Sequence, residues 1–310
     1  MKTIILASIL LTAQNPTLGE LKTSYDELQK LPWAQRLEKF GAHNDKVIKL
    51  IESDALKTGD EWFAVSNVLE APMPDFELNR IRYELAYAAA VTGHQEARAA
   101  LATRWDELTM SLGRNRTLES VKLPAGSNPP GTWIPNYSPK SIRDILLNPN
   151  TPRNPEKDST EIAKMFEEDQ AVREGSMDQK KIEEMVKGDQ KRMARIKDLL
   201  KQGKVKTGED FYKAAFLYQH GNTFAEYHTA HELSISAMIL GHKGAKWIGA
   251  ASYDRMLHSC GHRQRWATQY GIVGGQIMLQ RYDTSGTSDL ARKLVVGLSL
   301  EEAKNRKFNP

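Results

Sequence analysis

The sequence predicts an all-α protein made of two tandem copies of a multi-helix unit, stacked like a short helical-repeat array. Helix-capping sequences occur at Thr58 to Glu61 and at Thr207 to Asp210. In each, the threonine side chain can accept a hydrogen bond from a free backbone N–H group at the start of a helix. Glycines follow the apolar segments at positions typical of helix ends. A proline-rich stretch separates the two series of helices.

The first helical unit is predicted to span residues 20–120. Helices are expected within it at residues 24–40, 44–56, 58–71, 76–92 and 95–112. Pro32 is expected to break or begin a helix, and Pro72 to stop one. Gly93 and Gly113 are expected to close the last two helices.

Residues 121–158 are predicted to be a proline-rich linker. Trp133 and Tyr137 lie in this stretch, and an extended connector is favoured over a loop that covers a cleft. The second unit is predicted to span residues 159–310. Its helices are expected at residues 160–174, 178–201, 209–220, 225–240 and 243–259, with one short final helix within 289–306. The charges of residues 180–206 alternate in sign, which is typical of a solvated helix face.

The two helical series align with each other as an internal duplication. Thr58-Gly59 aligns with Thr207-Gly208. After a one-residue slip, matched pairs run through three helices: Glu84 with Glu232, Gly93 with Gly241, Asp106 with Asp254, and Gly113 with Gly261. Residues that both copies keep are interpreted as architecture. Residues that one copy alone carries are candidates for function.

Residues 1–19 are predicted to be a cleaved secretory signal peptide. One lysine precedes the apolar run from Ile4 to Ala13, which is too short to span a bilayer as a helix. Cleavage is expected after Ala13 or Gly19, so the protein is expected to be exported to the periplasm or the extracellular space. Cys260 is the only cysteine, so no intramolecular disulfide can form.

The charge pattern gives no indication of a nucleic-acid partner. The formal net charge is +4, and basic residues are interleaved with acidic ones rather than clustered. No later apolar run is long enough for a membrane helix. Gly274-Gly275 is too isolated to indicate a motif, and the sequence predicts no strand.

The stretch from Gln219 to Gln269 is richest in groups that perform chemistry. The polar residues that only the second copy carries are Gln219, His220, His231, Arg255 and Gln264, where the first copy has Glu70, Ala71, Tyr83, Glu107 and Arg116. Glu232 and Asp254 have counterparts in the first copy. A structural role is therefore about as well supported for them as a chemical one.

The second copy resembles a family of bacterial proteins known mainly as a domain of unknown function. The matching motifs are Asp169-Gln170 with Arg173, Ala214-Ala215 with Gln219-His220, Ala230-His231 with Leu233, Asp254-Arg255, Gly261 with Gln264, and Thr268-Gln269. The resemblance covers about residues 166–271. Ala267 departs from it, because the family pattern has glycine there. The family has no settled activity, so the resemblance supports the choice of residues and implies no reaction.

These residues predict a pocket for a small polar or peptide-like ligand, with acid–base chemistry of a hydrolytic kind. The predicted catalytic residues are His220, His231 and Asp254. A histidine would act as the base, and Asp169 or Asp254 would orient its ring. Arg173 and Arg255 would hold an anionic group. The residues expected to bind the ligand are Gln219, Arg255, Gln264, Gln269, Asp169 and Arg173.

Three alternatives remain open at this stage. His220, His228 and His231 could form a metal site with Asp254 or Glu232, but their order is not a known metal motif. No metal is therefore predicted, and the cofactor is unknown. Asp254 could instead belong to a buried polar network. The protein could also be a non-catalytic helical scaffold that binds another protein. Convergence of the predicted residues in one cleft would favour a binding or catalytic site.

Overall fold

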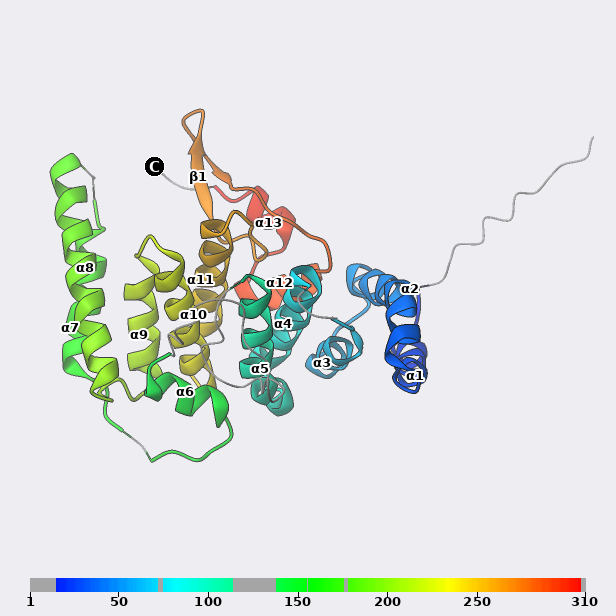
Figure 1. Ribbon diagram of the computed structural model, residues 1–310. Helices are drawn as coiled ribbons and strands as arrows, with labels where there is room; N and C mark the ends of the chain where they lie inside the picture. Colours follow the sequence, from blue (N-terminus) through cyan, green and yellow to red (C-terminus); the bar gives the residue numbers. More distant parts are fainter. Residues whose placement is uncertain (1–14, 72–74, 114–137, 155, 176–177, 308–310) are drawn as a thin grey trace, which may run out of the picture.

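A computed structural model describes residues 15–71, 75–113, 138–154, 156–175 and 178–307 (Figure 1). Within these ranges the chain forms thirteen α-helices and one short two-stranded hairpin. The predicted all-α fold class is confirmed. In the same ranges, no helix is long and apolar enough to cross a membrane.

The first half of the chain forms five helices. They are α1 (Leu18–Gln29), α2 (Trp33–Glu52), α3 (Gly59–Val68), α4 (Phe76–Val91) and α5 (Gln95–Ser111). Pro32 is the N-cap of α2, because proline fits the start of a helix but not its interior. The helix after Pro32 therefore runs through residues 41–43, where the sequence predicted a boundary. Thr58 and Glu61 form the expected capping box of α3.

The first residues of α1 bear on the predicted signal peptide. Residues 1–14 lie outside the described ranges, so the leader itself stays a prediction. Thr17 forms a capping box with Glu20, and Leu21 is buried. Cleavage after Ala13 would keep this cap. Cleavage after Gly19 would remove it.

A helix lies inside the predicted linker. Lys140–Leu147 forms α6, with Pro139 at its N-cap. Its apolar residues Ile142, Ile145 and Leu146 are buried, and the helix packs against α5 and α10. The spacing of these three residues places them on one helix face. The prediction of a linker considered only the proline content and missed this helical spacing. Trp133 and Tyr137 lie outside the described residues.

The second half of the chain forms five helices before its C-terminal segment. Its helices are α7 (Thr160–Val172), α8 (Gln179–Lys201), α9 (Gly208–Gln219), α10 (Phe224–Ile239) and α11 (Ala245–Ser259). The Thr207 side chain accepts from the backbone N–H of Asp210 at the start of α9, and the Asp210 side chain accepts from the backbone N–H of Thr207. The helix after Thr207 therefore begins as the sequence predicts.

The C-terminal segment differs from the prediction in two ways. The short antiparallel strands β1 (Tyr270–Val273) and β2 (Gln276–Leu279) form a hairpin. Gly274 and Gly275 make its turn with positive φ values of 58° and 82°, which glycine adopts without a steric cost. Two helices follow instead of one, α12 (Asp289–Val296) and α13 (Leu300–Lys304), separated at Gly297 with φ 82°.

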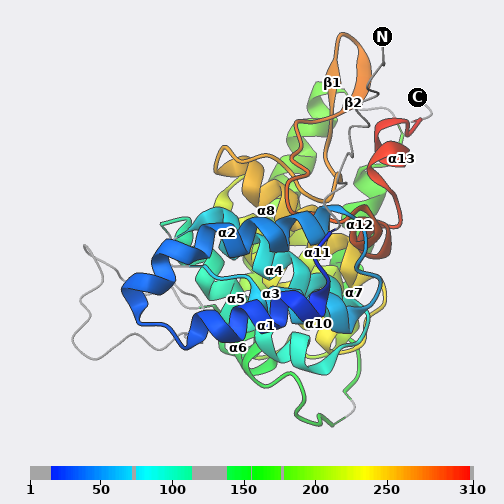
Figure 2. The same ribbon diagram turned by 90° about the vertical axis from the view of Figure 1, so that its right-hand side faces the viewer.

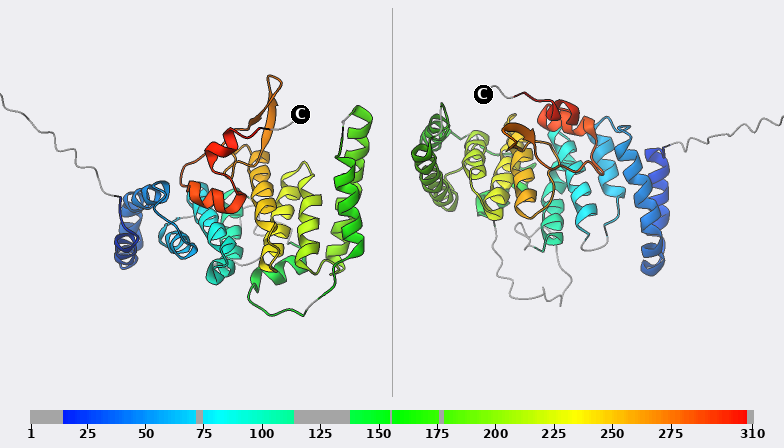
Figure 3. Two further views of the ribbon diagram at one scale, coloured as in Figure 1. Left: turned by 180° about the vertical axis from the view of Figure 1, so that it is seen from behind. Right: turned by 90° about the horizontal axis from the view of Figure 1, so that it is seen from above.

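The helices are arranged in layers that run outward from a shared centre. The pairs α4–α5 and α10–α11 lie in the middle (Figure 1), with α3 on one side and α9 on the other. The pairs α1–α2 and α7–α8 lie at opposite ends. The view from above shows the same order, with α12 and the hairpin crossing one side of the centre (Figure 3). Since α12 contacts both α4 and α11, it ties the two halves together.

Residues that the predicted duplication aligns contact one another crosswise at this centre. Trp105 donates to Glu232 over 3.1 Å, Tyr253 donates to Glu84 over 3.1 Å, and the Tyr83 hydroxyl is hydrogen-bonded to His231. Reciprocal contacts of this kind are typical of two units related by a two-fold axis. The layer order also differs from a head-to-tail stack. The duplication itself stays a prediction.

Candidate functional site

His231 lies in the centre of the protein and not in a cleft. Its ring is 0 % exposed and packs against Tyr83, Trp105 and Tyr253. Nδ1 lies 2.8 Å from the carbonyl oxygen of Gly249. A carbonyl can only accept, so Nδ1 carries the proton and Nε2 accepts from Tyr83. Burial lowers the pKa of His231 to about 3, so the ring is a neutral part of the core.

Asp254 is also buried, and its carboxylate organises the chain that follows α11. It accepts from the backbone N–H groups of Arg265 at 2.7 Å, Trp266 at 3.0 Å and Thr268 at 3.1 Å, and from the Thr268 hydroxyl at 2.7 Å. Burial raises the pKa of Asp254, and these four bonds oppose that rise. The geometry agrees with the buried polar network left open for this residue.

Gln264 joins the two ends of the hairpin. Its side-chain amide donates to the carbonyls of Gln269 and Gln280 at 2.9 Å each, and its oxygen accepts from the Gln269 N–H at 2.8 Å. All of its side-chain groups are thus bonded to backbone, and the residue is fully buried. Gln264 fixes the base of the hairpin and has no surface to offer a ligand.

Ala267 lies in the turn that Asp254 holds, with a left-handed φ of 60°. A side chain with a Cβ atom is strained in this region, which explains why glycine suits the position. Ala267 is the position at which the sequence departs from the bacterial family pattern, which has glycine there. The left-handed backbone gives a steric reason for that glycine.

Replacing Ala267 by glycine is expected to change the free energy of unfolding by less than about 0.5 kcal/mol. The relief of left-handed strain, about 1–2 kcal/mol, is offset by the added entropy of the unfolded chain, about 0.4–1 kcal/mol, and by the loss of a buried methyl group, about 0.8 kcal/mol. Urea denaturation of Ala267→Gly against wild type measures this. Ala267→Val should destabilise. A glycine variant less stable than wild type by about 1.5 kcal/mol or more would contradict the account, because only the two costs would then remain, with no strain relieved.

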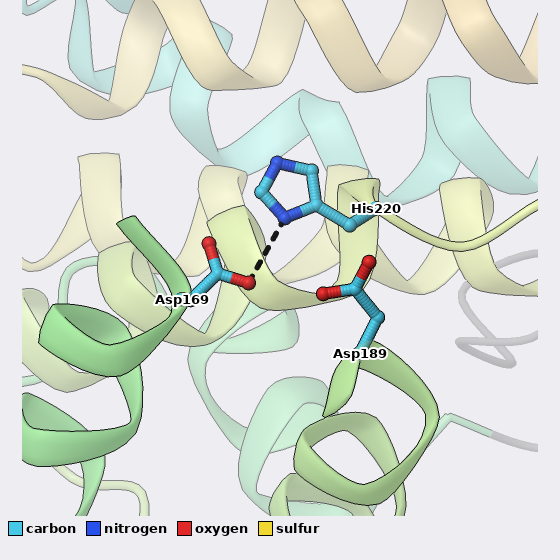
Figure 4. A group of neighbouring side chains, drawn as sticks. All are labelled: Asp169, Asp189 and His220. Carbon is cyan, nitrogen blue, oxygen red and sulfur yellow. Dashed lines mark hydrogen bonds and ion pairs between the residues drawn. The ribbon is translucent and has the colours of Figure 1, made fainter. Parts of the chain in front are cut away.

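Two predicted residues, Asp169 and His220, meet Asp189 where α7, α8 and α9 come together (Figure 4). Asp169 projects from α7, Asp189 from α8 and His220 from the end of α9. His220 Nδ1 lies 3.2 Å from Asp169. The Arg173 guanidinium donates hydrogen bonds to the carboxylates of Asp169 and Asp189, each over 2.8 Å. Burial would raise the pKa of Asp169, but the hydrogen bond from His220 and the charges of both arginines, Arg173 and Arg192, hold it below its usual value.

Asp169, Asp189 and His220 are the one group in the described ranges that could hold a metal ion, with ligand atoms within 4.8 Å of one another. Arg173 and Arg192 already neutralise both carboxylates, which disfavours a further cation. His228 and His231 do not join His220 in a metal site. His228 instead packs against Trp105, with ring centroids 4.9 Å apart and ring planes inclined by 35°.

Asp189 corrects one expectation. The alternating charges of residues 180–206 predicted a solvated helix face, but Asp189 is buried and paired with two arginines. Its partner Arg173 was predicted to hold a ligand and is instead engaged by Asp169 and Asp189. Charge alternation cannot separate a solvated face from an ion-pair network between helices.

A groove of about 380 Å³ lies beside this cluster, at the base of the hairpin. It is lined by Asn222, Tyr227, Arg255, His258, Ser259, Gln269 and Gln280. Arg255 donates to the Gln269 side chain at 2.9 Å and to the Gln219 carbonyl. Asn222 follows His220 by two residues, so the groove begins at the helix end that carries the Asp169–His220 pair.

Arg255 is half-buried, and no carboxylate pairs with it in the part of the chain that the structure describes. Burial lowers the pKa of Arg255, Tyr227 opposes this shift, and the positive charge of Arg173 lowers the pKa further. Burial and Arg173 both disfavour the charged guanidinium, and no acidic partner among the described residues offsets them. The guanidinium lines the groove, so an anion in the groove would compensate it.

A smaller hollow of about 230 Å³ shows the contrast. Its arginines Arg80 and Arg265 are buried, but each is paired with acids. Glu77, Glu84 and Asp283 supply these partners. The buried cations of this hollow are compensated within the protein, which distinguishes it from the groove at Arg255.

The predicted residues therefore divide among three places. Gln219, Arg255 and Gln269 meet at the groove. Asp169, Arg173 and His220 form the adjoining cluster. His231, Asp254 and Gln264 lie in the interior. The groove residues that were not predicted to bind a ligand are Asn222, Tyr227, His258, Ser259 and Gln280. Gln280 could not be found because the hairpin was not predicted.

Comparisons with protein-family models, curated proteins and solved structures found no match to this chain. The resemblance to a bacterial family of unknown function is neither supported nor contradicted by them. The candidate site therefore depends on its own geometry.

Proposed function

We propose that the groove at the base of the hairpin binds a small polar or peptide-like ligand through an anionic group held by Arg255. One observation carries this proposal: Arg255 lines the groove half-buried, without an acidic partner among the described residues. A guanidinium binds carboxylate or phosphate through parallel hydrogen bonds. Tyr227, Asn222 and Gln280 add polar groups that could orient the ligand.

The Asp169–His220 pair supports an acid–base step at the same site. Asp169 bonds Nδ1 of His220, and the other ring nitrogen points away from both carboxylates (Figure 4). A carboxylate on Nδ1 fixes the tautomer in which Nε2 can accept a proton. His220 would then activate water against a ligand anchored by Arg255. The reaction proposed is hydrolysis, without His231 or Asp254 as catalytic residues.

The proposed site is compatible with the predicted export of the protein and with the predicted family resemblance. Export after cleavage of residues 1–19 would place the groove in the periplasm or outside the cell. Membership of the resembling bacterial family would assign Gln219, Arg255 and Gln269 to the shared motif. Both points are proposals that the groove geometry does not require.

An Arg255→Gln variant is expected to lose anion binding. The probes are an N-acetylated dipeptide with a free carboxylate, its amidated form and inorganic phosphate, measured by calorimetry. Wild type should bind at least one anionic probe and not the amide. The variant should bind it about 10- to 100-fold more weakly, since a charge-assisted hydrogen bond contributes about 1.5–3 kcal/mol.

Arg263→Gln is the matched control, because Arg263 is exposed and lines the other hollow. His220→Gln separates binding from chemistry. It should keep the probe affinity and lose any cleavage of the dipeptide. Equal affinities in wild type and Arg255→Gln would reject the groove as an anion site.

A further inference from the structure

The hairpin tip exposes large apolar side chains. Ile272 is 78 % exposed, Val273 62 %, Ile277 48 % and Met278 50 %. No charged residue occurs from Tyr270 to Gln280. The hairpin projects away from the helices in two perpendicular views (Figures 1 and 2). Such clustering on a protruding element marks an interaction surface.

The apolar side chains lie on both faces of the hairpin. Ile272 pairs with Ile277 across the strands, and these two share one face. Val273 and Met278 occupy the other face, because neighbours along a strand point to opposite sides. A protein packed against one face would leave the other in water. Covering both faces requires surroundings that enclose the tip.

The base of the hairpin carries positive charge. Arg281 follows β2 and is exposed. α13 packs beside β2 and brings Lys304, which is exposed and lies 3.9 Å from Glu301, and Arg306, which lies 5.9 Å from the Tyr270 ring. Arg281, Lys304, Arg306 and Lys307 outnumber the acids Glu301 and Glu302 here. An uncharged tip above a collar of net positive charge fits the change from hydrocarbon to phosphate at a bilayer surface.

We propose that the β1–β2 hairpin inserts its tip into the surface of a lipid bilayer that contains anionic lipid. The strands are four residues long, or roughly 13 Å at about 3.3 Å per residue, which matches the depth of the headgroup and upper acyl region. The unpaired outer edges of the strands limit insertion to this zone, because backbone groups need hydrogen-bond partners. Gln269 and Gln280, at the hairpin base, then place the groove next to the membrane surface.

A label at the tip tests insertion directly. An environment-sensitive fluorophore is attached to Gln276→Cys in a Cys260→Ser background and mixed with vesicles of phosphatidylcholine and phosphatidylglycerol. The emission should shift to the blue. The same label on Lys197→Cys, on the exposed face of α8, should not shift. Because this readout is local to the tip, binding through the apolar run of residues 4–13 cannot produce it.

Two variants then test the two faces. Ile272→Ser and Val273→Ser should each weaken the tip-dependent partition on the order of tenfold, and Val186→Ser, an exposed valine on α8, should not. Arg281→Gln should weaken binding only to vesicles with phosphatidylglycerol. An unshifted tip label overturns the proposal. Loss confined to one face, together with dissociation of a dimer in sedimentation, also overturns it in favour of a second copy of the chain.

Discussion

Acidification is expected to destabilise the wild-type protein more steeply than a His231→Gln variant. Burial lowers the pKa of His231 to about 3, whereas an unfolded histidine titrates near 6.5. The unfolded chain therefore binds a proton at mildly acidic pH that the folded protein cannot accept. The resulting stability is fully present above about pH 6.5 and is lost as pH falls toward 3. By pH 4.5 the loss is about 2.5 kcal/mol.

The measurement is the free energy of unfolding in urea at pH 7 and pH 4.5. At neutral pH the variant is expected to be less stable by about 1–3 kcal/mol, because glutamine fills the ring cage poorly and leaves polar partners unpaired. On acidification the two proteins should converge. His262→Gln is the control, since His262 is partly exposed against Phe76. Parallel losses in wild type and His231→Gln would mean that His231 is not buried in its neutral form.

The same residue shows what sequence comparison within the chain could and could not give. Alignment of the two copies singled out His231 because the first copy has Tyr83 at that position. In the structure these two residues are hydrogen-bonded to each other at the centre. A tyrosine hydroxyl needs an acceptor and an imidazole can supply one. The difference between the aligned positions therefore drew attention to Tyr83 and His231. It did not distinguish a buried structural pair from a catalytic residue.

Local signals predicted the helices well, since capping and helix-ending glycines act within a few residues. Thr58 and Thr207 cap helices as predicted, and Gly93 and Gly241 have positive φ. Features that depend on distant partners were missed. Asp189 is buried only because Arg173 and Arg192 reach it.

The groove illustrates the same limit for function. Arg255 and Gln269 were predicted to bind a ligand, and they meet at the groove. Their meeting depends on the turn after α11, which Asp254 and Gln264 hold together. The sequence contained all four residues but could not show which ones face the solvent and which support them.

The largest loss of stability is expected when this support is removed. Asp254→Ala should lower the free energy of unfolding by about 3–5 kcal/mol, because it leaves three buried N–H groups and the Thr268 hydroxyl without their acceptor. Asp254→Asn keeps one acceptor oxygen and should lose less, about 1.5–3 kcal/mol. Thr268→Val removes one donor, and about 1 kcal/mol is expected. Urea denaturation measures all three.

Asp45→Ala, an exposed acid on α2, controls for the change in charge and should shift stability by less than about 0.5 kcal/mol. Loss of a supporting residue lowers ligand affinity in proportion to the loss of stability. Loss of a catalytic residue abolishes the reaction even when the protein stays stable. If Asp254 supports the groove through residues 265–268, then anion affinity at Arg255 should fall with the same order as stability: alanine most, asparagine less, Thr268→Val least. An Asp254→Asn variant that is as stable as wild type, yet cannot cleave a bound dipeptide, would return Asp254 to the catalytic residues.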